Sequence, residues 1–95
     1  MTPNYTPAPW TLHRKDALRW IDAGPLCIAE VPEDEDGEPQ EGNALLIAAA
    51  PDLLMALGML YAETADYIRL NKLGGMDNQC MQLARAALAK AVGAA

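Results

Sequence analysis

The 95-residue chain lacks the residue types on which most enzyme active sites depend. It has no serine, one histidine (His13) and two cysteines, Cys27 and Cys80, which stand far apart without a CxxC spacing. These absences exclude serine nucleophiles and leave too few ligands for a zinc site or a histidine-based triad. The only glycine pair, in "LGGM", is typical of a helix end rather than of a phosphate loop. The sequence therefore predicts neither catalysis nor a bound metal or cofactor.

Phenylalanine is also absent, and most of the apolar residues are alanine and leucine. Because alanine buries little area, the core of a monomer this short is expected to be marginal, and burial against a second copy would supply the rest. The N-terminus has no basic and apolar leader, and the apolar run 44–60 contains a proline and an aspartate at its middle. The sequence therefore predicts no signal peptide and no membrane span. The cysteines are expected to be reduced, with Cys80 buried.

The net charge of −6 is concentrated in one segment. Seven acids and no base lie between residues 30 and 41, whereas the rest of the chain has six acids against seven lysines and arginines. The acidic segment is expected to be a solvated loop, because it also holds prolines and glycines. Its acids Glu33, Asp34, Glu35 and Asp36 form a charged connector, or else a surface that mimics DNA phosphates towards a protein partner or that binds a cation, although their spacing does not fit an EF-hand. Direct binding of nucleic acid is not expected near this loop.

The sequence pattern predicts a single α+β domain. Alternating apolar residues predict a small antiparallel β-meander with strands near 10–15, 17–22 and 26–31. A short helix over 14–22, with Asp16 as its N-cap, is the alternative. The predicted boundaries are an extended proline-rich arm over 1–9, the meander over 10–31, the acidic loop over 32–42 and a helical part over 43–95. Trp10 and Trp20 are expected in the meander core, with a stacking platform as the alternative.

The helical part is expected to contain three helices. Asn43 is a suitable N-cap for a short helix over 43–49. Pro51 then predicts a break, because proline is disfavoured inside a helix and favoured at its first position. A long helix from 51 to about 72 is expected to form a helical hairpin with a last helix over about 77–92.

The first half of the long helix is apolar nearly all round, which predicts more than one packing partner. The meander and the last helix are expected to cover two of its sides. A further face, formed by Leu45, Met55, Gly58 and Met59, is predicted to contact another subunit. The sequence therefore predicts a homo-oligomer, at least a dimer.

Basic and aromatic residues gather near the far end of the long helix. If the last two helices are antiparallel, Arg69 and Lys72 lie near Arg85, and Tyr61 or Tyr67 can stack on a base. These five residues predict a site for an anionic ligand. The alternative is that the charges are solvated and paired with neighbouring acids.

Two motifs resemble those of a set of small phage and prophage proteins. "TPAPW" at 6–10 is similar to the pattern TPGPW, and "NALLIAAAPDLLMAL" at 43–57 is similar to NARLIAAAPELLEAL. With "IAEV" at the end of the meander, the match covers about a quarter of the chain. The chain departs from the pattern at Leu45, where the family has Arg, and at Met55, where it has Glu. Both changes make the surface more apolar and favour a partner contact.

The resemblance implies a phage accessory protein that counters host defence in the cytoplasm of an infected bacterium. In outline the chain is also similar to the Thoeris anti-defence sponges, which have an N-terminal sheet, C-terminal helices and an oligomeric assembly. That similarity implies sequestration of a cyclic ADP-ribose or cyclic oligonucleotide signal without catalysis, and no binding residue is carried over from it. The alternative is an anti-CRISPR-like protein that inhibits a host defence complex through its acidic loop.

Overall fold

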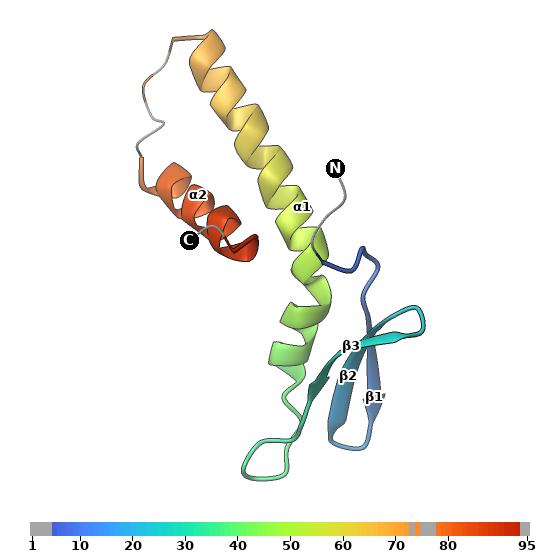
Figure 1. The fold of residues 1–95 in the computed structure, drawn as a ribbon. Coiled ribbons are helices and arrows are strands. Elements are labelled where there is room, and N and C mark those ends of the chain that lie inside the picture. The colour runs from blue at the N-terminus through green and yellow to red at the C-terminus, as the bar shows by residue number, and fades with distance from the viewer. Residues whose placement is uncertain (1–4, 73, 75–77, 94–95) are drawn as a thin grey trace. The chain divides into compact units, whose positions relative to one another are not determined.

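The structure, a computed structural model, describes residues 5–72, 74 and 78–93. Three strands precede two helices along the chain (Figure 1). Their bounds are Thr11–Lys15 for β1, Leu18–Ala23 for β2, Leu26–Val31 for β3, Glu41–Leu70 for α1 and Gln79–Ala91 for α2. The predicted α+β class, with an antiparallel sheet followed by helices, is confirmed. The chain divides into two compact units, Met1–Asp52 (unit 1) and Leu53–Ala95 (unit 2).

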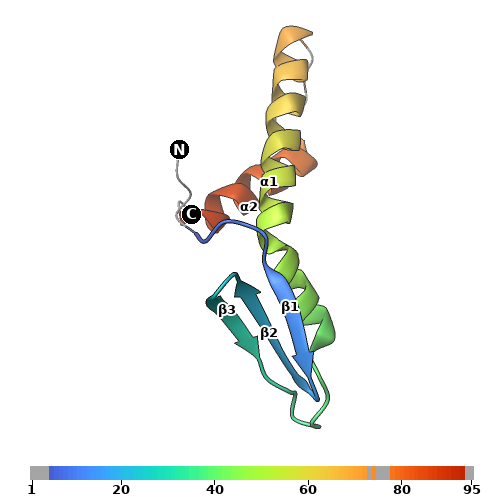
Figure 2. The same ribbon diagram turned by 90° about the vertical axis from the view of Figure 1, so that its right-hand side faces the viewer.

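Unit 1 is built on a three-stranded antiparallel sheet of order β1-β2-β3 (Figure 2). The β1–β2 connection contains Asp16 at φ 54°, and the β2–β3 connection contains Gly24 at φ 61°. Asp and Gly are among the residues that accept this left-handed conformation most readily, so both sharp reversals have a local cause. The strand interpretation of residues 18–22 is therefore correct, and the alternative helix with Asp16 as its N-cap is wrong.

The core of unit 1 lies between the sheet and the first turns of α1. Ile21 and Ala44 are fully buried, Val31 is nearly so, and half-buried apolar residues surround them. Because Ala44 has only a methyl group, the helix backbone can approach the sheet closely. A β-bulge makes Ile28 the extra residue of β3, since Ile21 pairs with Ala29 and Asp22 with Cys27. Both Ile28 and Ala29 consequently reach the core.

Helix α1 runs through Pro51 without a break, so the predicted division into a short and a long helix is wrong. A proline at this position removes one backbone hydrogen bond, and its ring crowds the carbonyl four residues before it. Pro51 is buried, and Ala44 and Ala48 on the preceding turns pack in the core of unit 1. Burial of the ring and of these turns offsets the local cost. Asn43 is likewise not an N-cap, because α1 already begins at Glu41.

Unit 2 contains the second part of α1 and the helix α2, which form a helical hairpin (Figure 1). Asn78 is the N-cap of α2 and its side-chain oxygen accepts a hydrogen bond from the Met81 amide at 2.9 Å. The predicted start at Asp77 lies outside the described residues. Ile68 of α1 and Met81 of α2 are the large apolar residues buried among those described in this unit. A methyl group added to Gly58 would lie 3.9 Å from Cδ2 of Leu88, so this glycine is on the side of α1 that meets α2.

Candidate functional site

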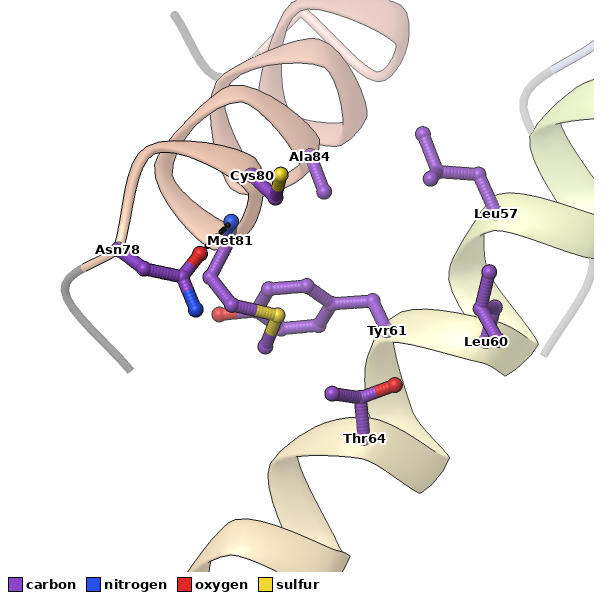
Figure 3. Close-up of a pocket in the computed structure, with 8 residues that line it drawn as sticks. All are labelled: Leu57, Leu60, Tyr61, Thr64, Asn78, Cys80, Met81 and Ala84. Carbon is purple, nitrogen blue, oxygen red and sulfur yellow. Dashed lines mark hydrogen bonds between the residues drawn. The ribbon is translucent and has the colours of Figure 1, made fainter. Parts of the chain in front are cut away.

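A groove of about 320 Å³ lies between the two helices of unit 2. Its walls are mostly apolar, and the side chains that form them come from both helices (Figure 3). They are Leu57, Leu60, Tyr61 and Thr64 of α1, and Asn78, Cys80, Met81 and Ala84 of the α2 region. The volume lies at the lower end of the range of ~300–1,000 Å³ that is usual for small-ligand sites.

The N-terminus of α2 forms one end of the groove wall. Asn78, Cys80 and Met81 belong to its cap and first turn, and that turn contains no acid. The first amide N–H groups of a helix have no partner inside the helix, and the helix dipole adds partial positive charge there. The Asn78 side chain satisfies the amide of Met81. This end of the groove therefore favours an anionic group over a cationic one.

Tyr61 and Arg85 are brought together across the helical hairpin. The Arg85 Nε donates a hydrogen bond to the Tyr61 hydroxyl at 3.0 Å, although the two residues are 24 positions apart. Tyr61 lines the groove, and Arg85 follows the groove residue Ala84 directly in the chain. The arrangement holds a guanidinium beside the aromatic wall of the groove.

The other residues of the predicted anion site do not join this pair. Arg69 lies next to Asp66, with which it forms an ion pair, and Tyr67 is 62% exposed. Lys72 follows the end of α1 in a left-handed conformation, φ 54°. Arg69 is eight residues from Tyr61 on the same helix, which corresponds to ~12 Å along its axis. Of the five residues predicted from the sequence, the structure brings Tyr61 and Arg85 into contact.

The residues of the predicted subunit interface are mostly exposed. Leu45, Met55 and Met59 are each at least half exposed. Gly58 differs from them, since it faces Leu88 of α2. The free thiol Cys80 is also exposed, which corrects the expectation that it is buried, and Cys27 is free and exposed as well.

The outer face of the sheet carries a cluster that the sequence analysis missed. The His13 and Trp20 rings stack at 5.3 Å between centroids, and both side chains meet the same carboxylate oxygen of Asp22. The distances to Oδ2 of Asp22 are 3.3 Å from His13 Nε2 and 3.2 Å from Trp20 Nε1. Both tryptophans were expected in the core. Trp10 does pack against it, but Trp20 lies on the outer face of the sheet, so the expectation for Trp20 is wrong. The spacing of Trp20 and Asp22 by two residues could have predicted that they share one face of the sheet. The position of His13 beside them could not be predicted, because it depends on the register between β1 and β2.

This cluster shows no arrangement typical of nucleophilic catalysis. Cys27 pairs with Asp22 across the β2–β3 ladder, so a strand separates it from His13 on β1. The thiol instead donates to the Ala29 carbonyl at 3.8 Å. In the part of the chain that the structure describes, no group of three or more His, Cys, Asp or Glu side chains could hold a metal ion.

Two of the seven acids of this segment lie in regular secondary structure, Glu30 in β3 and Glu41 in α1, and the other five lie in the loop between them. Glu41, the first residue of α1, accepts hydrogen bonds from Arg14 Nε at 3.0 Å and from Arg19 Nε at 2.5 Å. The bond from Arg14, followed by that from Arg19, lowers the pKa of Glu41 to about 2. Arg19 is buried, and it also donates to two carbonyls near the β1–β2 turn. Glu41 therefore links β1 and β2 to the start of α1.

The rest of the acidic loop is ordered by Asp34. Its Oδ1 accepts from the amides of Asp36 at 2.9 Å and Glu38 at 3.0 Å, and its own amide donates to the Glu38 carbonyl. Such side-chain-to-backbone bonds are typical of Asx turns. Glu33, Glu35 and Asp36 are exposed on this loop. The loop presents a fixed group of carboxylates without a base.

Helix α1 is long and apolar enough to cross a membrane by length and composition, with a mean hydropathy of 1.8 in its most apolar window. Since Pro51 lies inside the helix, the interruption that the sequence argument used against a span does not occur. The core helix of a soluble protein passes the same test but is mostly buried, whereas 11% of this window is buried inside the structure. One helix of this kind is by itself weak evidence for a membrane.

The family model described as Salmonella phage P22 protein Y8K6 matches residues 1–95 of the chain. No curated protein and no solved structure matches the chain.

Proposed function

Since the chain belongs to the family of Salmonella phage P22 protein Y8K6, we propose that it is a phage accessory protein that acts by binding and not by catalysis. Its role is to counter host defence by sequestering a small anionic nucleotide signal, either cyclic ADP-ribose or a cyclic oligonucleotide. It acts as a homo-oligomer in the cytoplasm of the infected bacterium. The groove of unit 2 is the ligand site.

The observation that carries this proposal is the composition of the groove. A nucleobase needs apolar walls and an aromatic surface, which Leu57, Tyr61 and Met81 provide. A phosphate needs donors and positive charge, which the first turn of α2 and the guanidinium of Arg85 provide. These two environments adjoin at the Tyr61–Arg85 contact, where a nucleotide would present both its base and its phosphate.

The test is a binding screen by thermal shift and calorimetry with cyclic ADP-ribose isomers and cyclic oligonucleotides. Arg85→Ala should weaken binding of the best ligand ~10- to 100-fold, since a hydrogen bond to a charged group is worth ~1.5–3 kcal/mol. Arg69→Ala is the matched control, because that arginine pairs with Asp66 away from the groove. The proposal fails if no compound in the screen binds, or if the two variants weaken binding equally.

The ordered acidic loop favours a second candidate function, inhibition of a host defence complex. Five carboxylates lie between residues 33 and 38 without a base, and the bonds to Asp34 fix the backbone that presents them. A surface of this kind can dock on a basic patch that normally binds DNA phosphates. In this case the active residues are Glu33, Glu35 and Asp36, and Asp34 is structural.

The two candidates separate in a phage protection assay with paired variants. The triple variant Glu33→Gln, Glu35→Gln and Asp36→Asn leaves Asp34 intact and should abolish protection if the loop is the inhibitor. Arg85→Ala should abolish it if the groove is the site. Association of a protein partner should also slow markedly with salt, because the Debye length is ~8 Å at 0.15 M. Binding of a small ligand in the groove should be less sensitive.

A further inference from the structure

Unit 2 leaves most of its large apolar side chains exposed. Eight of them are more than half exposed, whereas two, Ile68 and Met81, are buried among the residues described there. The exposed ones are Leu53, Met55, Met59, Leu60, Tyr67, Leu70, Leu83 and Val92. The two buried side chains contribute ~1.5–3 kcal/mol each, and half-buried residues such as Leu57 and Leu88 add less per side chain. Such a surface needs a partner.

Part of this surface repeats every seven residues. Leu53, Leu60 and Tyr67 are spaced by seven and are 52%, 62% and 62% exposed. Ala56 and Leu70 follow Leu53 and Tyr67 by three positions, which gives the 3–4 spacing of a coiled-coil contact line. Leu46 continues the spacing of seven in the N-terminal direction and is 63% exposed. We call Leu53, Ala56, Leu60, Glu63, Tyr67 and Leu70 the seam.

We propose that a second copy of this chain docks on the seam, and that the two α1 helices pair as an antiparallel coiled coil. A contact line with this period fits another helix that has the same period, and the second copy supplies one. Four seam side chains, Leu53, Leu60, Tyr67 and Leu70, are each more than half exposed and contribute apolar surface to the interface of ~800 Å² per partner that a stable dimer requires. A lipid surface fits less well, because Glu63 lies within the seam and Asp66 and Arg69 follow on the same helix.

The sequence of the seam selects the antiparallel orientation. In a parallel pair, Glu63 would face Glu63 of the partner subunit, and like charges inside a coiled coil are destabilising. In an antiparallel pair the layers are Leu53 with Leu70 of the partner subunit, Ala56 with Tyr67 of the partner subunit, and Leu60 with Glu63 of the partner subunit. The small Ala56 then leaves space for the tyrosine ring, and the two acids are kept apart.

This proposal specifies the homo-oligomer of the proposed function but does not depend on the nucleotide. Leu60 belongs to both the seam and the groove, so the partner helix lies beside one rim of the ligand site. It also differs from the interface predicted from the sequence, since Met55 and Met59 are not seam positions. Dimerisation and ligand binding are measured in separate experiments, so the dimer proposal can be wrong while the nucleotide proposal holds, and the reverse.

Sedimentation at micromolar concentration tests the seam with two matched variants. Leu53→Glu should raise the dissociation constant of the dimer ~100-fold or more. Each of the two copies carries the substitution, so two carboxylates are placed in the apolar interface. Met55→Glu is the control, since Met55 is equally exposed, at 58% against 52% for Leu53, and lies off the seam. A monomeric wild-type protein would overturn the proposal. So would a dimer that Met55→Glu dissociates and Leu53→Glu does not, or flotation of a monomer with vesicles of bacterial lipids.

Disulfide crosslinking tests the orientation in a Cys27→Ala, Cys80→Ala background. Ala56→Cys and Tyr67→Cys proteins carrying tags of different mass are mixed and oxidised. The antiparallel pair predicts a mixed covalent dimer of the two variants and little product from either alone. Dimers formed within each variant instead would show a parallel pair and overturn the proposed orientation.

Discussion

Units 1 and 2 use apolar residues in opposite ways. Unit 1 encloses Ile21, Val31 and Ala44 between a sheet and a helix, and it pairs the buried Arg19 with Glu41. Unit 2 has a single layer of two helices, and most of its large apolar side chains remain in contact with solvent. A sheet with a helix on one face can enclose a small core, whereas two helices leave their outer faces open. The difference indicates that unit 1 has an enclosed core, whereas unit 2 leaves most of its large apolar side chains uncovered.

Truncating Ile21, at the centre of the unit 1 core, should change the free energy of unfolding more than any other variant proposed here. Ile21→Ala is expected to lower the free energy of unfolding by ~2–5 kcal/mol, because Ile21 is fully buried and the cavity cannot close easily. Leu26→Ala on the same sheet is the control, since Leu26 is 52% exposed, and it should cost far less. Urea unfolding followed by tryptophan fluorescence measures both.

If Ile21→Ala fails to fold, Ile21→Val keeps the comparison measurable at ~0.5–1.5 kcal/mol. Equal costs for Ile21→Ala and Leu26→Ala would show that unit 1 does not have the core described.

A smaller effect is expected from breaking the link between the sheet and α1. In the unfolded chain Glu41 has an ordinary pKa of 4.5, and the hydrogen bonds from Arg14 and Arg19 lower it to about 2 in the fold. A lowered pKa means that the ion pairs stabilise the fold above pH ~4.5 and that this contribution is lost as the pH falls through about 2. Glu41→Gln should therefore lower the melting temperature at pH 7, and the difference from wild type should shrink towards pH 2.

Glu38→Gln serves as the control for this experiment, because Glu38 is an exposed loop acid. It should change the melting temperature little at any pH. A Glu41→Gln difference that stays constant from pH 7 to pH 2 would contradict the assignment of the low pKa to Glu41.

The smallest effect is expected at Pro51, near the boundary of the two units. Pro51→Ala restores a backbone donor inside α1 but frees the unfolded chain and removes a buried ring, so the net change should be within ~1 kcal/mol. Hydrogen exchange should detect stronger protection of the amides around residue 51. Pro39→Ala, in the loop, should leave the exchange of α1 unchanged. Protection that falls around residue 51 would mean that the proline ring holds this turn of the helix.

Local sequence patterns were sufficient to predict much of the fold. The alternation in 10–31 predicted all three strands within about one residue, and the turn residues placed both reversals. The composition of 32–42 predicted a polar acidic loop, and the apolar periodicity after it predicted helix. These features depend on neighbours within a few positions, which is why they can be read from the chain. Part of the candidate site was also predictable, since the sequence had grouped Tyr61 with Arg85 and the two side chains do form a hydrogen bond.

Only the tertiary structure decided which distant residues meet. Pro51 is a helix breaker by local rules, yet α1 continues through it because burial in unit 1 offsets the lost hydrogen bond. Glu41 looked like one more loop acid until the fold placed it against Arg14 and Arg19, 27 and 22 positions away. The His13–Trp20 stack depends in the same way on strand register. A sequence specifies which side chains are available, but contacts across strands and helices are selected by packing, whose energy depends on the whole fold.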